Sequence, residues 1–226
     1  MNQRNASRRP VTVDEEQLAL RCARGRVVVI DDDVEILAAL SALMDLEGYA
    51  CETYACAADY LNMLTYNRPS FAGPACVLCD VKMPEIDGLE LLQRLAELDD
   101  TPLVLISGAS SVHDVARGFR SAALDFLIKP MDADLLLASV ARALASSTQR
   151  QQARLLQADL ARRLATLTPR ERDIARRIAS GQTNPEVAQA LGIALRTAKL
   201  HRQRALEKLG VESLPALVRL SDQCQL

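Results

Sequence analysis

Polar side chains with complementary chemistry follow four apolar, strand-like runs in this sequence. Asp31 and Asp32 follow VVVI, Asp80 follows CVLC, Ser107 follows PLVLI, and Lys129 follows LDFLI. In an open parallel sheet, ligands bind beyond the carboxyl ends of the strands. Four such ends carrying three carboxylates, a hydroxyl and an ammonium therefore indicate one site suited to Mg²⁺ and a phosphoryl group.

Each group has a definite role in such a site. Asp31 and Asp32 can hold Mg²⁺ together with Asp80, because Mg²⁺ prefers hard oxygen ligands. Asp80 can attack phosphorus as a nucleophile and form an acyl phosphate. Lys129 can contact the transferred group as a point charge, and Ser107 can donate a hydrogen bond to a phosphoryl oxygen.

Short apolar runs alternate with segments of helical period between residues 26 and 145. The runs cover 26–30, 50–54, 75–79, 102–106 and 124–128, and the helical segments cover 34–47, 56–65, 88–97, 111–120 and 132–145. Five such units predict an α/β fold with a doubly wound, five-stranded parallel sheet. Right-handed crossovers then place all strand ends on one edge. We interpret Asp33 and Asp132 as a turn or cap residue and a helix N-cap, respectively.

The composition is that of a soluble globular protein, with 49% apolar and 25% charged residues. No apolar run approaches the roughly 18 residues that a membrane span requires. The N-terminal MNQRNASRRP lacks the apolar core of a signal peptide, so we expect a cytoplasmic protein whose residues 1–25 form a mobile tail.

The six cysteines are expected to be reduced, as is usual in the cytosol. Cys76 and Cys79 have C-x-x-C spacing, but residues three apart on a strand point to opposite faces. Two further zinc ligands at suitable spacing are also missing from the sequence. A metal or redox role for this pair is therefore disfavoured.

Charge is distributed unevenly along the chain. Residues 26–145 carry 19 acidic and 8 basic side chains, whereas residues 168–226 carry 6 and 10. Such asymmetry favours a nucleic-acid partner for the basic half, although an excess of arginine alone is more often a solvated face.

Residues 146–167 contain no Gly or Pro and are rich in helix formers, which predicts a helical linker. Leu156, Leu160, Leu164 and Leu167 line one of its faces. The stripe fits a linker helix that covers a domain surface, and it also fits a helix that pairs with a second subunit.

Residues 168–226 read as four helices without strands. Thr168 and Glu171 form a capping box around a proline at the first helical position. That helix ends near Gly181, and the others cover 185–191, 195–209 and 213–222. Two helices joined by a short Gly-containing turn, the second one basic, are typical of a helix-turn-helix.

The stretches VVVIDDD, CVLCDVKMPEIDGLELL, PLVLISG and ALDFLIKP resemble the receiver domain of two-component response regulators over residues 26–145. The resemblance implies strand order 2-1-3-4-5 and phosphorylation of Asp80 by a sensor histidine kinase. It also implies that the backbone of Lys82 completes the magnesium shell, and that the peptide before Pro130 is cis. In this family the switch couples Ser107 to an aromatic residue, here Phe126, which also fits an ordinary core position.

Residues 167–220 resemble the LuxR-type four-helix DNA-binding domain, so the whole chain is similar to FixJ/NarL-type transcriptional regulators. In that arrangement the helix 195–209 enters the major groove. The residues expected near its groove-facing half are Arg196, Thr197, Lys199, Leu200, Arg202 and Gln203. Lys and Arg would attract phosphates, whereas Arg202 and Gln203 could reach base edges and Leu200 a thymine methyl.

The resemblance implies a homodimer that forms on phosphorylation, binds promoter DNA and acts on RNA polymerase, commonly as an activator. Its chemistry would be limited to its own phosphorylation and dephosphorylation. A phosphorylation-independent DNA-binding protein and a phosphoryl sink that drains a kinase are alternatives. A regulator that binds an acylated autoinducer is another, but it would need an apolar cavity in place of the acidic site.

Ala194 stands at the N-cap of the helix 195–209, where relatives often have serine. Because an alanine cap costs about 1 kcal/mol of helix stability, we predict that Ala194→Ser raises the melting temperature. Thermal unfolding followed by circular dichroism checks this, and an unchanged melting temperature would contradict the assignment of the cap.

Overall fold

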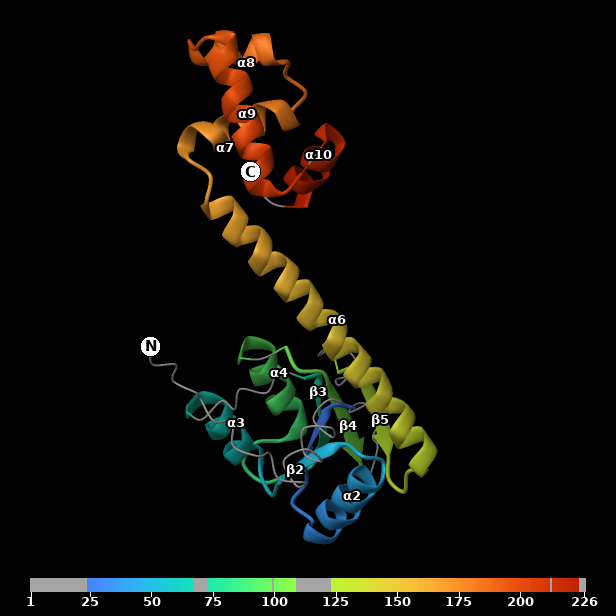
Figure 1. The fold of residues 1–226 in the computed structure, drawn as a ribbon. Helices are drawn as coiled ribbons and strands as arrows, with labels where there is room; N and C mark the ends of the chain where they lie inside the picture. Colours follow the sequence, from blue (N-terminus) through green and yellow to red (C-terminus); the bar gives the residue numbers. More distant parts are fainter. Residues whose placement is uncertain (1–23, 67–72, 99, 109–122, 212, 224–226) are drawn as a thin grey trace, which may run out of the picture. The chain divides into compact units, whose positions relative to one another are not determined.

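A computed structural model describes residues 24–66, 73–98, 100–108, 123–211 and 213–223 (Figure 1). Within them, a five-stranded parallel sheet has the order β2-β1-β3-β4-β5. The strands are β1 (Arg26–Ile30), β2 (Ala50–Tyr54), β3 (Ala75–Asp80), β4 (Leu103–Ser107) and β5 (Asp125–Ile128). The α/β fold with this strand order is therefore confirmed, and the first two strands have the bounds expected from the sequence.

Two of the polar site residues are themselves the last residues of strands. Asp80 pairs with Ile106, and Ser107 pairs with Ile128, so β3 and β4 each extend to the residue expected to follow the apolar run. A strand ends where its backbone hydrogen bonds to the neighbouring strand end, and this pairing does not require an apolar side chain at the last position. Each residue is thereby fixed by pairing with one neighbouring strand, Asp80 with β4 and Ser107 with β5.

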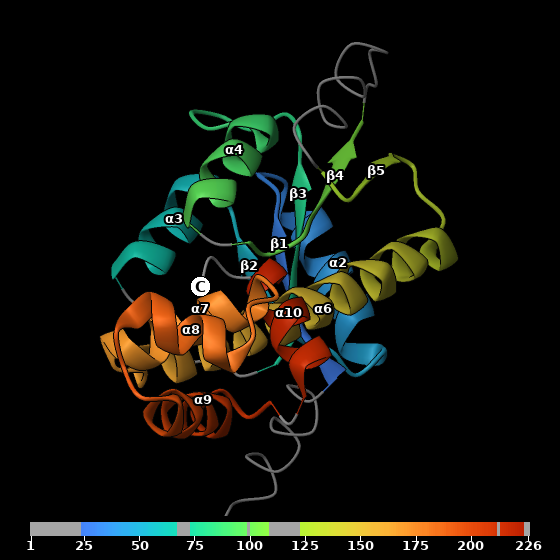
Figure 2. The same ribbon diagram turned by 90° about the horizontal axis from the view of Figure 1, so that it is seen from above.

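Helices cover both faces of the sheet. Helices α2 (Val34–Leu46) and α6 (Ala133–Ala165) pack on one face, and α3 (Ala57–Tyr66) and α4 (Gly88–Leu98) on the other (Figure 2). Asp33 caps α2 through hydrogen bonds from the backbone amides of Glu35 and Ile36. The helix expected at 111–120 and the tail expected at 1–25, apart from its last two residues, lie outside the described residues.

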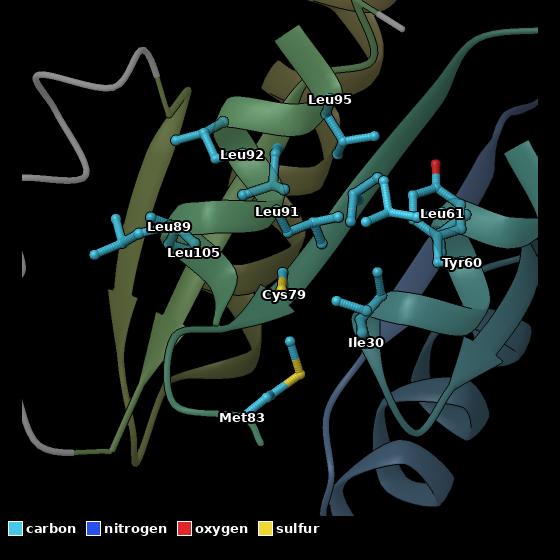
Figure 3. Packing of buried hydrophobic residues seen from close by; sticks show 14 of the residues in the cluster. Ile30, Tyr60, Leu61, Cys79, Met83, Leu89, Leu91, Leu92, Leu95 and Leu105 are labelled. Carbon is cyan, nitrogen blue, oxygen red and sulfur yellow. The ribbon is translucent and has the colours of Figure 1, made fainter. Parts of the chain in front are cut away.

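Alternate residues of the central strands enter two separate cores, as the period of a strand requires. Ile30 and Cys79 face α3 and α4, where they pack with Tyr60 and Leu91 (Figure 3). Cys76 lies in the other core, against α2 and α6. The expectation that Cys76 and Cys79 point to opposite faces is therefore confirmed.

Helix α6 is continuous from Ala133 to Ala165, although separate segments at 132–145 and 146–167 were expected. Residues 133–165 contain no Gly or Pro, so nothing in the sequence interrupts the backbone hydrogen bonds of the helix. The Asp132 carboxylate accepts from the amide of Asp134 at 2.8 Å, so Asp132 caps the helix. The chain divides into two compact units between Gln151 and Gln152, inside α6.

Four helices of the second unit enclose a third core. They are α7 (Pro169–Ala179), α8 (Asn184–Leu191), α9 (Leu195–Leu209) and α10 (Leu214–Gln223) (Figure 1). The capping box of α7 is present, with Thr168 N donating to Glu171 Oε2 at 2.9 Å. Ala194 occupies the N-cap of α9 and supplies no side-chain hydrogen bond, as expected. None of the described helices is long and apolar enough to cross a membrane.

The leucine stripe of residues 156–167 does not form one uniform face. Leu167 is buried in the core of the second unit and Leu164 packs against that core, whereas Leu156 is 72% exposed. The last two leucines of the stripe therefore pack in the second unit, whereas the first is open to solvent.

The last turns of α6 are joined to the end of α9 by Arg163. Its Nη1 atom donates to the carbonyl oxygen of Leu209 at 3.2 Å, and its Nη2 atom pairs with Asp159 at 2.6 Å. Gly210, with φ 67°, leaves room for this guanidinium, because a Cβ there would lie 2.5 Å from Nη1. A cation at a helix C-terminus is stabilising because it faces the orphan carbonyls.

We predict that Arg163→Ala destabilises the second unit by about 1 kcal/mol, because the α9 carbonyl loses a charged donor. Arg162→Ala is the matched control, since Arg162 pairs with the same Asp159 and is 80% exposed in its side chain. Chemical denaturation of the two variants measures the difference. Equal losses would contradict a specific role for the contact with Leu209.

Candidate functional site

Four strand ends bring Asp31, Asp80, Ser107 and Lys129 to one edge of the sheet. Asp31 is 2% exposed, Asp80 6% and Ser107 1%, so the polar groups are almost completely withdrawn from solvent. The sheet places them there because β1, β3 and β4 run parallel and are buried on both faces. Lys129 follows the edge strand β5 and approaches from one side.

The ammonium of Lys129 lies between the two buried carboxylates. Its Nζ atom is 2.6 Å from Asp31 Oδ2 and 2.7 Å from Asp80 Oδ1. Burial disfavours the charged amine, but the hydrogen bonds and charges of the two aspartates outweigh it and raise the pKa of Lys129. A firmly charged lysine is what two neighbouring buried carboxylates require.

Backbone amides hold the remaining oxygen of each buried aspartate. Lys82 N donates to Asp80 Oδ2 at 2.7 Å, and Asp33 N donates to Asp31 Oδ1 at 3.0 Å. Gly88 backs the same loop, because a Cβ at that position would clash with the carbonyl oxygen of Asp80. The Asp80 carboxylate is thus fixed in orientation, which is a requirement for a nucleophile that must align with an incoming group.

Ser107 has a hydroxyl that lacks a hydrogen-bond partner among the described residues, although its oxygen is buried. Buried polar atoms are nearly always paired, so such an atom needs an explanation. Its position at the end of β4, next to the strand that ends in Asp80, suits a donor for a group attached to that carboxylate. Phe126 is half-buried on β5 and packs against the core that contains Leu105.

The carboxylate oxygens of the site are ligands that a hard divalent cation prefers, but in the described part of the chain they are not arranged around a common point. Asp31 and Asp80 offer carboxylate oxygens beside the exposed Asp32. Within the described residues, however, no group of three acidic, His or Cys side chains converges as a metal site. In this arrangement the single positive charge of Lys129 lies against both buried carboxylates and offsets part of their negative charge.

The second candidate site is the solvent-exposed face of α9. Ala198, Ala205 and Leu209 are buried, and the opposite face exposes Arg196, Lys199, Leu200 and Gln203. Leu200 is 45% exposed, an apolar side chain among cations. This mixture of charge, amide and one apolar group is suited to phosphates and base edges.

Two residues of the expected DNA-contact set are half-buried rather than exposed. Arg202 is half-buried and donates from Nη1 to Asn184 Oδ1 of α8 at 3.1 Å, and Thr197 is half-buried as well. His201 is half-buried too, and its Nδ1 atom lacks a partner among the described residues. Arg202 therefore joins the two helices of the motif in this structure.

Sequence reasoning missed two residues on the exposed face, Arg204 and Glu207. Glu207 accepts a hydrogen bond from Gln203 Nε2 at 2.9 Å. Both were missed because the expected contacts were placed in the N-terminal half of the helix. A helical projection centred on Ala198, Ala205 and Leu209 would have placed them opposite the core.

Comparison with known proteins gives concordant matches for both units. A family model described as response regulator receiver domain matches residues 27–141, and one described as bacterial regulatory proteins, luxR family, matches residues 165–221. The chain is 30% identical to the response regulator protein TodT of Pseudomonas putida, over 87% of this chain and 85% of TodT.

Other relatives match over similar lengths. Transcriptional regulatory protein FixJ of Bradyrhizobium diazoefficiens is 32% identical over 88% of this chain and 95% of its own. The solved structure of response regulator StyR superposes with a TM-score of 0.77 at 32% identity, covering 88% of this chain and 99% of StyR.

We predict that Ser107→Ala leaves the free energy of unfolding unchanged within about 0.5 kcal/mol or raises it, because it removes an unpaired buried hydroxyl. The matched control is Ser139→Ala. The Ser139 hydroxyl is fully buried and donates to Asp125 Oδ2 at 2.6 Å, so its loss should cost about 1.5 kcal/mol. Urea denaturation compares them, and a large loss for Ser107→Ala would reveal a partner for its hydroxyl.

Proposed function

Because the chain belongs to the two-component transcriptional response regulators that join a receiver domain to a LuxR-type DNA-binding domain, we propose that phosphorylation of Asp80 controls its binding to promoter DNA. The observation that carries this proposal is the fixed, buried carboxylate of Asp80, whose two oxygens are held by Lys129 and by the amide of Lys82.

The reaction is a phosphoryl transfer from a phosphohistidine of a sensor kinase. An Asp80 oxygen attacks phosphorus, an O–P bond forms, and the P–N bond breaks with the imidazole as leaving group. Asp31, Asp32 and Asp80, with the backbone of Lys82, would hold Mg²⁺. When bound, this ion supplies positive charge that offsets the repulsion between carboxylates and phosphate.

Lys129 and Ser107 respond to the new group. Lys129 already contacts Asp80 and follows the transferred charge with its ammonium, as a point charge can. The unpaired Ser107 hydroxyl gains an acceptor among the phosphoryl oxygens. That hydrogen bond moves β4 toward the site and allows Phe126 of the neighbouring β5 to turn inward.

The output is a change in pairing and in DNA affinity. The surface formed by residues 111–120, β5 and the first turns of α6 would pair two receiver domains, although residues 111–120 lie outside the described part of the chain. A dimer then presents two copies of α9 to two half-sites, which raises affinity through effective concentration. The DNA-bound dimer would then contact RNA polymerase at the promoter, in the cytoplasm.

The test is Asp80→Asn, which keeps the shape of the side chain and removes the nucleophile. With a small-molecule phosphodonor and Mg²⁺, the wild type should incorporate phosphate, dimerise in light scattering and protect promoter DNA in footprinting. The variant should do none of these above the level without phosphodonor.

Asp33→Asn is the matched control, because asparagine caps a helix as well as aspartate does. The Asp33 side chain caps α2, and it is not the proposed phosphoryl acceptor or a proposed magnesium ligand. This control should behave as the wild type. An Asp80→Asn protein that dimerises and protects DNA as well as the phosphorylated wild type would overturn the proposal.

A further inference from the structure

Gln203 and Glu207 form a hydrogen-bonded pair on the exposed face of α9. They are one turn apart, both are exposed, and Gln203 Nε2 lies 2.9 Å from Glu207 Oε1. Gln203 lines two surface hollows, one shared with Glu207 and with Asn184 of α8, and the other with Arg196 and Leu200. The amide is thus at the centre of the face that the DNA-binding function requires.

The chemistry of the pair fixes which way the amide points. A carboxylate only accepts hydrogen bonds, so the NH₂ group of Gln203 must face Glu207 and its Oε1 must face away. The second N–H of the amide stays available. Without this neighbour, a glutamine side chain can turn its amide over and offer donor or acceptor at the same place.

We infer that Glu207 is a positioning residue that sets the base preference of Gln203, an inference that rests on the proposed function of α9. An amide with a fixed acceptor and a free N–H matches adenine, which presents N6 as donor and N7 as acceptor in the major groove. The partner is therefore an A·T base pair at one position of each half-site.

The surroundings of Glu207 support this role. It lies on a face with Arg196, Lys199 and Arg204, yet among the described side chains it pairs with Gln203 and with none of these cations. An exposed glutamine–carboxylate pair is worth only about 0.2–0.5 kcal/mol in water. Inside a groove from which water is displaced, the same hydrogen bond becomes stronger and the orientation is held more firmly.

The experiment is selection of duplexes from a random-sequence library by the full-length protein treated with phosphodonor. Four proteins are compared: wild type, Glu207→Gln, Gln203→Ala and the double variant. Glu207→Gln is chosen because a glutamine at 207 can donate or accept, so it no longer dictates the orientation of Gln203. Asp173→Asn on α7 is the control for loss of one negative charge, and thermal unfolding verifies that each variant is folded.

For the wild type we expect adenine to be preferred at one position of the half-site. Gln203→Ala should remove that preference, and Glu207→Gln should reduce it by about fivefold or more while other positions keep theirs. The double variant should equal Gln203→Ala, because Glu207 acts through Gln203.

The outcomes separate the two levels of the proposal. If Gln203→Ala changes no base preference, α9 does not read bases through this face, and both the proposed contact set and the inference fail. If Gln203→Ala changes a preference but Glu207→Gln leaves it intact, only the inference fails. A uniform gain in affinity for all sequences, equal to that of Asp173→Asn, would assign Glu207 a purely electrostatic effect and overturn its positioning role.

Discussion

The ammonium of Lys129 between Asp31 and Asp80 is the interaction on which the first unit depends. Two nearly buried carboxylates at neighbouring strand ends repel each other, and burial removes the water that would screen this repulsion. Contacts of 2.6 and 2.7 Å to one lysine remove that instability and tie β5 to β1 and β3. Any group that adds negative charge to Asp80 must therefore compete for, or share, the same lysine. This makes the position of β5 sensitive to the charge on Asp80.

The position of β5 in the sheet connects the site to helix α6. β5 is the edge strand of the described sheet, and it pairs with β4 on one side only. Asp125, its first residue, pairs with Arg142 and accepts from Ser139, both on α6. Burial opposes the charge of Asp125, but these hydrogen bonds prevail and lower its pKa, so the ionised contact persists at neutral pH. β5 is therefore held by fewer backbone hydrogen bonds to neighbouring strands than the central strands, which are paired on both sides.

Much of this architecture could be predicted because apolar runs and helical periods are local properties. The order of strands and the edge at which Asp80, Ser107 and Lys129 lie followed from parallel topology and from the resemblance. The direct contact of Lys129 with both aspartates depends on side-chain distances that no spacing in the sequence encodes. The continuity of α6 was missed because the change in composition at residue 146 marks a change of surroundings rather than an end of the helix. The hydrogen bond from Arg202 to Asn184 could not be predicted because Asn184 belongs to another helix.

The two ends of α9 are held very differently, and this bears on how it can meet DNA. At its C-terminal end, Arg163 contacts the carbonyl of Leu209, and Lys208 pairs with the buried Glu171 at 2.6 Å. The hydrogen bond from Lys208, together with that from the Thr168 amide, lowers the pKa of Glu171, so this anchor stays charged at neutral pH. At its N-terminal end, Ala194 provides no cap, and the first-turn amides remain without a side-chain acceptor from that position. The residues expected to face the major groove lie between these ends. The C-terminal half of α9, which carries Gln203, is therefore tied to the rest of the second unit by two charged contacts, whereas the N-cap position adds no side-chain hydrogen bond near Arg196.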